Sequence, residues 1–253
     1  MKLLISRLSI AVAGLASVLM FTWPLFITSK IASEAALAQA VFIVLMPLVL
    51  ILVLVEFASG DIGAKQLALL GVLIALNAVI RMLGAGTAGI ETAFFLVILG
   101  AFVFGSGFGF ILGASSIFVS ALLTGGIGPW LPFQMMGVGL VGLGAGLIPK
   151  FTRSWQQKTS LVVYAVISSF VYGSLMTMWN WPFLAGTGTQ LSYVAGDPII
   201  SNLTRFFQYE LITGGFFWDL GRALTTSVLI LLTSQSLLAT LNRAASKAGV
   251  RRG

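Results

Sequence analysis

The chain contains no cysteine and no histidine. Without cysteine there are no disulfides and no thiolate chemistry, and without histidine the commonest metal ligand and general base is missing. We therefore expect no metal site and no enzymatic activity. Charged residues are also scarce, at 8% of the 253 residues. No charged, polar or alternating segment is long enough to form a separate water-soluble domain.

Hydrophobic residues fill most of the chain instead. They make up 58% of it, and the mean hydropathy is +1.05. A helix needs about 20 mostly apolar residues to cross a bilayer. The sequence therefore predicts an all-α integral membrane protein with six to eight crossings. The candidate spans are 8–28, 36–57, 65–83, 90–104, 107–123, 131–149, 159–181 and 214–241.

The fourth and fifth candidate spans are short and rich in glycine. Only Gly105-Ser106 separates 90–104 from 107–123. So short a connection predicts either a tight hairpin between two helices or a partial crossing by one of them.

The first two spans predict an N-terminal transmembrane hairpin over 1–63, ahead of a core over 64–253. The start of the chain also looks like a secretory signal, with Ala38-Gln-Ala40 as a cleavage site. A second long apolar run, 41–55, follows that site directly. An uncleaved hairpin in a bacterial inner membrane is the simpler interpretation.

The basic residues predict the orientation, because loops that stay in the cytoplasm are enriched in lysine and arginine. With both termini inside, ten of the fourteen positive residues are cytoplasmic. They are scattered over loops that flank the membrane rather than gathered on a soluble face, which argues against nucleic-acid binding. The ten are Lys2, Arg7, Lys65, Lys150, Arg153, Lys158, Arg243, Lys247, Arg251 and Arg252.

Polar residues collect at the opposite, outer ends of the predicted helices. A charge at the bilayer centre costs roughly 2.5–3.5 kcal/mol, so such residues normally face the bundle interior. Arg81 and Glu91 flank the loop 84–90, while Asp219 and Arg222 are three residues apart. Each pair is either a structural or interfacial feature or part of a ligand site. The candidate site residues are Asn77, Arg81, Glu91, Trp130, Gln134, Trp179, Asn180, Asp219 and Arg222.

The segment 124–134, Thr-Gly-Gly-Ile-Gly-Pro-Trp-Leu-Pro-Phe-Gln, separates two apolar runs. Its glycines and prolines do not continue a helix, and irregular backbone at membrane depth is tolerated only beside protein or a watery cavity. The segment is therefore predicted to line a ligand site. Trp130, Trp179 and Trp181 either contact that ligand or belong to an interfacial aromatic belt.

Residues 198–212 carry apolar side chains at helical spacing after Asp197-Pro198. This pattern predicts a helix with Asp197 as its cap and proline in the first turn. Such a helix is either a lid over the mouth of the bundle or an interfacial helix that anchors a loop.

Small residues recur along the third span at intervals of four, three, four and three. Such a face lets another helix approach closely, either from within the chain or from another membrane subunit. The residues of this small-residue face are Ala64, Ala68, Gly71, Ala75 and Ala78.

The sequence offers no energy source for transport. No glycine-rich phosphate loop ending in Gly-Lys-Ser or Gly-Lys-Thr occurs, and no series of carboxylates runs through the predicted spans. A transport function would therefore draw its energy from a partner.

Three stretches carry a resemblance to a known family: Ala75-Leu-Asn-Ala-Val-Ile-Arg81, Gly105-Ser-Gly-Phe-Gly-Phe-Ile-Leu-Gly113, and Gly125-Gly-Ile-Gly-Pro-Trp-Leu-Pro-Phe-Gln134. Over 67–241 the chain resembles the substrate-binding S components of energy-coupling factor (ECF) vitamin transporters. It looks most like actinobacterial members, including those assigned to cobalamin uptake. The N-terminal hairpin is additional to the six-helix pattern of that family.

The resemblance implies a protein that captures a vitamin outside the cell, beneath loops equivalent to 84–90 and 124–132. It also implies a membrane coupling (T) subunit, which the small-residue face would contact, and two ATPases that use ATP. No cofactor is expected in the chain itself. Two other functions fit the residues, namely a secondary transporter driven by an ion gradient and a membrane scaffold or assembly factor without a ligand.

Overall fold

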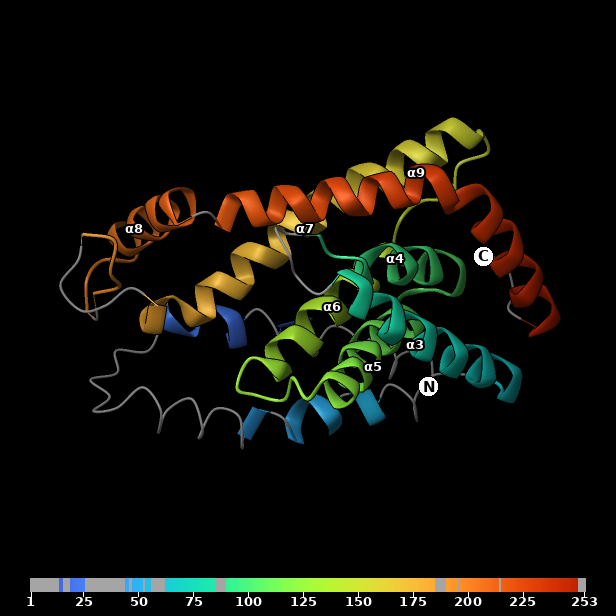
Figure 1. Ribbon diagram of the computed structural model, residues 1–253, viewed down its shortest axis with the longest axis horizontal. Coiled ribbons are helices and arrows are strands. Elements are labelled where there is room, and N and C mark those ends of the chain that lie inside the picture. Colours follow the sequence, from blue (N-terminus) through green and yellow to red (C-terminus); the bar gives the residue numbers. More distant parts are fainter. Residues whose placement is uncertain are drawn as a thin grey trace.

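The protein was analysed as a computed structural model (Figure 1), which describes residues 14–15, 19–25, 44–45, 47–51, 53–55, 62–84, 90–184, 190–194, 196–213 and 215–249. The described part is helical and has no strand. A short 3-10 helix, η1, covers Trp23–Leu25. The α-helices are α3 (Ala64–Gly84), α4 (Ala93–Phe104), α5 (Ser106–Thr124), α6 (Leu131–Ala145), α7 (Ser154–Leu184), α8 (Ile199–Ile212) and α9 (Gly215–Lys247).

The helices α3, α5, α7 and α9 are long and apolar enough to cross a membrane, while α4 and α6 are shorter apolar helices. Each of the six predicted core spans overlaps one of these helices. The all-α membrane fold expected from composition is thus confirmed.

Helix α4 lies at the centre of the bundle, where α3, α5, α6 and α9 surround it. Its residues from Ala93 to Val103 are all buried. At 12 residues it is about 18 Å long, well short of the roughly 30 Å of a bilayer core. Gly105, with φ 97°, then turns the chain directly into α5. A tight hairpin with one short helix is therefore what forms here.

Helices α5 and α6 pack closely because glycines face one another across their interface. A methyl group at Gly109 would collide with the backbone of Gly142, and one at Gly113 with the backbone of Val138. Small residues take the place of bulky side chains where membrane helices approach closely. This packing fixes the start of α6 beside the end of α5.

The predicted N-terminal hairpin, 1–63, falls largely outside the described residues. Its described parts pack against the core. Phe21 is fully buried, and its ring centroid lies 5.6 Å from that of Phe133 in α6. The Trp23 indole donates a hydrogen bond to the carbonyl oxygen of Trp179 in α7, at 3.2 Å.

The helices give the bundle two ends of different character. Lys65, in the first turn of α3, lies beside the end of α9, where its Nζ donates to the Lys247 carbonyl at 3.5 Å. We call this the basic end; it lies at the right of Figure 1. The other end, which we call the cavity end, holds Arg81, Glu91 and Trp130.

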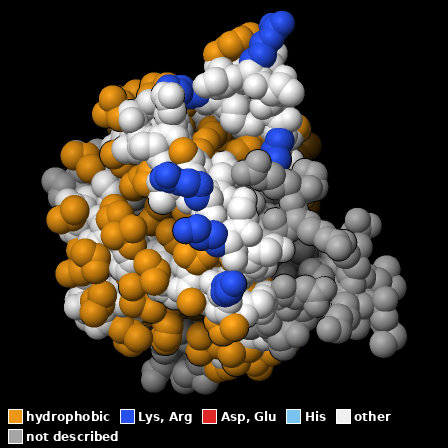
Figure 2. All heavy atoms as spheres, turned by 90° about the vertical axis from the view of Figure 1, so that its right-hand side faces the viewer, with side chains coloured by type: hydrophobic (Ala, Val, Ile, Leu, Met, Phe, Trp, Pro, Cys, Tyr) orange, Lys and Arg blue, Asp and Glu red, His pale blue; other side chains and the backbone are white. Residues whose placement is uncertain are grey.

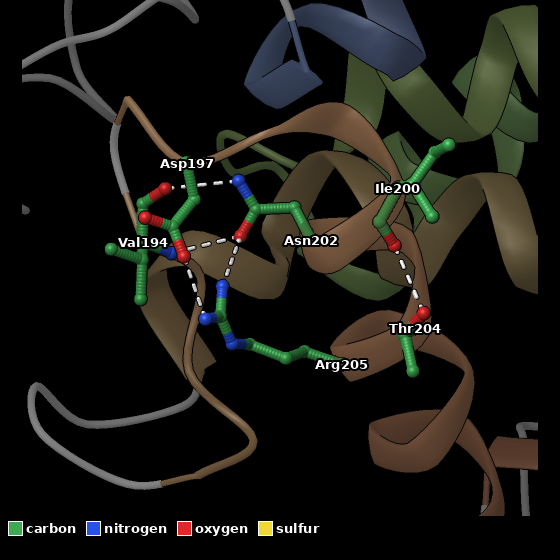
Figure 3. Close-up of polar contacts among 6 residues, drawn as sticks. All are labelled: Val194, Asp197, Ile200, Asn202, Thr204 and Arg205. Carbon is green, nitrogen blue, oxygen red and sulfur yellow. Dashed lines mark hydrogen bonds and ion pairs between the residues drawn. The ribbon is translucent and has the colours of Figure 1, made fainter.

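Helix α8 forms where the sequence predicts it, but Asp197 is not its cap. Pro198 occupies the N-cap position, with φ −51° and ψ 139° and no side-chain cap bond. Asp197 therefore lies one residue too early to reach the free amides of the first turn. Its carboxylate instead accepts a hydrogen bond from Arg205 Nη2 at 2.6 Å (Figure 3).

The segment before α8 is held by the side chain of Asn202. Its Nδ2 donates to the Val194 carbonyl at 2.9 Å, and its Oδ1 accepts from the Val194 amide at 3.1 Å (Figure 3). Arg205 Nη1 donates to the same Oδ1. These bonds tie the loop to the first two turns of α8.

Candidate ligand-binding site

A cavity of about 460 Å³ opens at the cavity end, between α3, the start of α4, α5 and the start of α6. This volume lies within the range of about 300–1,000 Å³ that is typical of small-molecule sites. The residues that line it are Arg81, Met82, Glu91, Ser120, Thr124, Gly126, Trp130 and Gln134. Four of the nine predicted site residues are among them: Arg81, Glu91, Trp130 and Gln134.

Arg81 and Glu91 bring opposite charges to the cavity without neutralising each other. Arg81 Nη1 donates to the Ser120 hydroxyl at 3.0 Å, while the buried Nε has no protein partner. Glu91 Oε1 accepts a hydrogen bond from the Ala93 amide at 3.3 Å. Within the described residues, the two side chains form no ion pair. The guanidinium and the carboxylate therefore both keep hydrogen-bonding capacity for a ligand.

The junction of α3 and α4 fixes the positions of these two charges. The Thr92 hydroxyl donates to the Ile80 carbonyl at 2.7 Å. A methyl group at Gly84 would collide with the same threonine side chain. The end of α3, which carries Arg81, is thus held against the residues that precede α4, which carry Glu91.

The loop after α5 places Trp130 at the cavity. Gly125 ends α5 in the left-handed region, with φ 68°. The Trp130 ring lies over Gly128, where a methyl group would collide with it, and its Nε1 donates to the Gly126 carbonyl at 3.3 Å. The tryptophan remains 45% exposed. Part of its ring is thus exposed at the cavity.

Hydroxyl side chains of α5 that are not among the predicted site residues form one wall of the cavity. Ser116, Ser120 and Thr124 are spaced four apart on α5 and so share one helix face. Ser120 and Thr124 line the cavity directly, as do Met82 and Gly126. The polar stripe on an otherwise apolar helix is the signal that identifies the two hydroxyl residues.

Asn77 supports the cavity from below rather than lining it. The side chain is fully buried, and its Nδ2 donates to the Ser116 hydroxyl at 2.9 Å. Ser116 in turn donates to the Gly113 carbonyl. Asn77 therefore joins α3 to α5 one turn beneath the bond between Arg81 and Ser120.

Asp219 and Arg222 pair with each other between α7 and α9 and do not line the cavity. Arg222 Nη1 donates to Asp219 Oδ1 at 2.5 Å and to the Ser169 carbonyl at 3.3 Å. Its guanidinium lies 4.8 Å from the centroid of the Tyr172 ring. Of the two interpretations of this pair, the structure supports the structural ion pair.

Trp179 and Asn180 also lie away from the cavity. Trp179 is buried and stacks on Phe133, with ring centroids 3.9 Å apart and ring planes at 8°. Asn180 is half-buried next to it in α7. The tryptophan packs the core at the junction of α6 and α7.

Helix α8 packs against α7 and α9, and none of its residues lines the cavity. Phe206 is buried against Trp181, with ring centroids 5.6 Å apart. Ile200, Phe207 and Leu211 on α8 are exposed. This placement agrees with an interfacial helix that anchors its loop.

The small-residue face of α3 is open for most of its length. Ala64, Ala68, Gly71 and Ala75 are exposed, and no described atom lies within 4 Å of a methyl group placed on Gly71. Ala78 is buried within the bundle. The first four residues thus leave a shallow apolar strip on the surface.

The fold and the cavity define a multi-pass, all-helical membrane protein with a small polar site at one end. The model of the family described as "ECF transporter, substrate-specific component" matches residues 65–240. The chain belongs to this family. Neither the curated proteins nor the solved structures contain a significant match to it.

Membership in the family has direct consequences. Proteins of this family are the substrate-binding subunits of ECF importers in the cell membrane, and they work with a T subunit, ATPase subunits and a small ligand. They are transporter subunits rather than enzymes. The matched residues, 65–240, lie within the core expected over 64–253, whose bounds stay a prediction.

Proposed function

We propose that the protein captures a vitamin-sized ligand in the cavity between Arg81, Glu91 and Trp130. The observation that carries the proposal is the Arg81 guanidinium in the wall of a cavity of about 460 Å³. Its Nη1 donates to Ser120, and its Nη2 has no protein partner among the described residues. A ligand acceptor in the cavity would bind at Nη2, and a hydrogen bond to a charged group contributes about 1.5–3 kcal/mol.

The lining predicts the chemistry of the ligand. The Arg81 guanidinium matches a carboxylate, phosphate or amide oxygen, because a planar fork of donors binds such groups well. The Glu91 carboxylate matches a donor or a cationic group, and Trp130 matches a ring. The expected ligand is a compact ring-bearing vitamin or vitamin precursor that carries both an acceptor and a donor.

The size of the cavity bears on the resemblance to cobalamin-uptake proteins. Sites of 300–1,000 Å³ bury most of the surface of a drug-sized molecule. A corrinoid is far larger than that, and at about 460 Å³ most of it would stay outside. Within this proposal, a smaller ligand such as a thiamine precursor fits better than cobalamin.

The proposed orientation puts the cavity end outside and both termini in the cytoplasm. It is supported by the described lysines and arginines at the basic end, since cytoplasmic segments retain such residues. In this orientation the cavity faces the side from which an importer receives its substrate.

The exposed part of the small-residue face, from Ala64 to Ala75, is the proposed contact for the T subunit. Close helix approach needs small side chains, and this strip has no partner among the described residues. ATP would be hydrolysed by the partner ATPases, and no cofactor would reside in this chain.

The proposal is tested by thermal unfolding of the purified protein against a panel of vitamins and precursors. A compact ring-bearing vitamin should raise the Tm of the wild type and have a much smaller effect on Arg81→Ala. Arg205→Ala is the matched control, because Arg205 forms an ion pair at α8 and lies outside the cavity. Equal stabilisation of all three proteins would refute the site.

The alternative functions give different results. A secondary transporter would take up ligand in liposomes by the chain alone under a proton or sodium gradient. A scaffold would bind no member of the panel. Co-purification of a T subunit and two ATPases, with uptake that needs all of them, would support the proposed role.

A further inference from the structure

A second cavity, of about 280 Å³, lies at the basic end of the bundle. It is formed by the end of α4, the connection from α6 to α7, the start of α7 and the last turns of α9. We call it the basic-end groove. It shares no lining residue with the cavity beside Arg81. Its lining residues are Phe102, Val103, Lys150, Phe151, Gln157, Leu238, Asn242 and Ala245.

The groove combines an apolar wall with a polar rim. Phe102, Val103 and Leu238 supply hydrocarbon surface from α4 and α9. Lys150 and Asn242 supply polar atoms. The Asn242 Nδ2 donates to the Leu238 carbonyl at 2.7 Å, which leaves its side-chain oxygen without a protein donor among the described residues.

The rim is held in place by Gln157. Its Oε1 accepts a hydrogen bond from the Phe151 amide at 2.9 Å, and its Nε2 donates to the Ser160 hydroxyl at 3.3 Å. The first bond ties the segment that connects α6 and α7 to the first turn of α7. Lys150, next to Phe151, is thereby placed at the mouth of the groove.

Among the residues that the structure describes, the charge around the groove is of one sign. None of the described lysines and arginines at the basic end forms an ion pair. The described acidic residues, Glu91, Asp197, Glu210 and Asp219, all lie toward the other end. Figure 2 looks onto the basic end and shows, among the described residues, lysine and arginine side chains beside hydrophobic surface and no acidic side chain. The basic residues are Lys65, Lys150, Arg153, Lys158, Arg243 and Lys247.

We propose that the basic-end groove binds an anionic phospholipid, with its phosphate at Lys150 and the start of an acyl chain along Phe102, Val103 and Leu238. Clusters of basic residues at the cytoplasmic ends of membrane helices attract anionic lipids, and basic pockets between such helices hold their head groups. A free phosphate would satisfy the lysine and leave the apolar wall wet. A lipid satisfies both.

The small-residue face is a separate surface, because it lies on α3 and α3 supplies no residue to the groove. Lipid binding here would stabilise the joint between α4, α7 and α9 from the side opposite the ligand cavity. Lipid binding at the basic-end groove depends neither on the identity of the ligand nor on the T subunit.

The test measures lipid binding to the full-length protein in neutral detergent by native mass spectrometry. Phosphatidylglycerol and phosphatidylcholine with identical acyl chains are compared. The wild type should retain phosphatidylglycerol preferentially. Lys150→Gln should reduce that preference about fivefold, the effect of one cation near an anionic lipid surface. Leu238→Trp should lower retention of both lipids by filling the groove.

Lys65→Gln is the matched control, since Lys65 belongs to the basic end but lies outside the groove. It should leave the preference nearly unchanged. An equal loss in Lys65→Gln and Lys150→Gln would show a diffuse surface effect and overturn the proposal. Thermal unfolding of each variant establishes that it is folded, and the conservative Lys150→Arg variant should restore the preference.

Two soluble probes distinguish the source of the phosphate. Inorganic phosphate and glycerol phosphate should not compete with phosphatidylglycerol at equal concentration. Full competition by either would identify a site for a soluble anion and contradict the lipid proposal. Absence of any lipid preference, with capture of an ATPase subunit that Lys150→Gln abolishes, would assign the groove to a protein partner instead.

Discussion

Arg81 and Ser120 are joined across α3 and α5 by a hydrogen bond of 3.0 Å from Nη1 to the serine hydroxyl. The bond holds the guanidinium in the cavity wall while its Nε stays buried and unpaired. Arg81 is therefore oriented by the protein before any ligand arrives, which lowers the entropy lost on binding.

Replacement of Arg81 by lysine should weaken ligand binding although the charge is kept. Lysine is a point charge and does not reproduce the planar fork of donors. A hydrogen bond to a charged group contributes about 1.5–3 kcal/mol, so we expect the Kd to rise about 10- to 150-fold. Isothermal titration with the vitamin found in the panel measures this. Unchanged affinity would show that Arg81 does not contact the ligand.

Gly128→Ala should weaken ligand binding by displacing the Trp130 ring. A methyl group at Gly128 collides with the indole ring, and the ring must move from its place at the cavity. We expect weaker ligand binding in Gly128→Ala and in Trp130→Ala. Trp130→Phe should keep part of the affinity, because a phenyl ring still offers an aromatic face on which a ligand ring can stack. Gly63→Ala, where no atom lies within 4 Å, is the control.

Gly71→Leu should separate ligand binding from assembly. The position is open on the surface of α3, so the variant should fold and bind ligand normally. A bulky side chain would prevent close approach of a partner helix, and co-purification with the T subunit should fall sharply. Val163→Trp, on the exposed side of α7, is the matched control and should assemble normally. Normal assembly of Gly71→Leu would exclude this face as the contact.

Gly173→Ala should destabilise the core. Gly173 in α7 lies directly against the Asp219 carboxylate, and an added methyl group would displace it from Arg222. Breaking a buried ion pair costs about 3–5 kcal/mol. Thermal unfolding in detergent should show a clearly lower Tm. A Gly71→Ala control adds the same methyl group in open space and should show no such loss.

The stability of the folded protein should depend on pH through Glu210. Burial raises the pKa of this α8 carboxyl above its ordinary value of 4.5, and the Thr177 hydroxyl and the Arg222 charge oppose the shift only in part. The protonated form therefore favours the folded state. Its contribution is complete below about pH 4.5 and is lost as the pH rises through the raised pKa.

Glu210→Gln should accordingly raise the Tm at neutral pH and flatten the dependence between pH 4.5 and 7.5. Gln208→Ala, at an exposed position of the same helix, is the control. A lower Tm of Glu210→Gln at neutral pH would mean that the charged form is the one the fold requires.

Local pattern predicted much of this protein. Runs of apolar residues located the six core helices, and the glycines and prolines of 124–134 located the loop that lines the cavity. The pattern also located α8, although not its cap. These features depend on neighbours in the chain, through helix length, helix periodicity and turn chemistry, and so the sequence expresses them directly.

Which polar side chains pair with one another across helices depended on contacts between distant parts of the chain. Arg81 and Arg222 look alike in the sequence, as arginines near helix ends with an acidic residue nearby. In the structure Arg222 forms an ion pair with Asp219 and lies against the Tyr172 ring. Glu91 instead accepts a hydrogen bond from the Ala93 amide, so Arg81 keeps donors for a ligand.

The sequence by itself thus determined the membrane class, the helices, the irregular loop and the small-residue face of α3. Tertiary structure alone decided that Arg81, Glu91, Trp130 and Gln134 share one cavity, that Ser120 and Thr124 complete its wall, and that Asn77, Trp179 and Asp219 support the bundle. The physical reason is that a buried polar group takes the nearest partner in space, and proximity across helices is set by packing rather than by order along the chain.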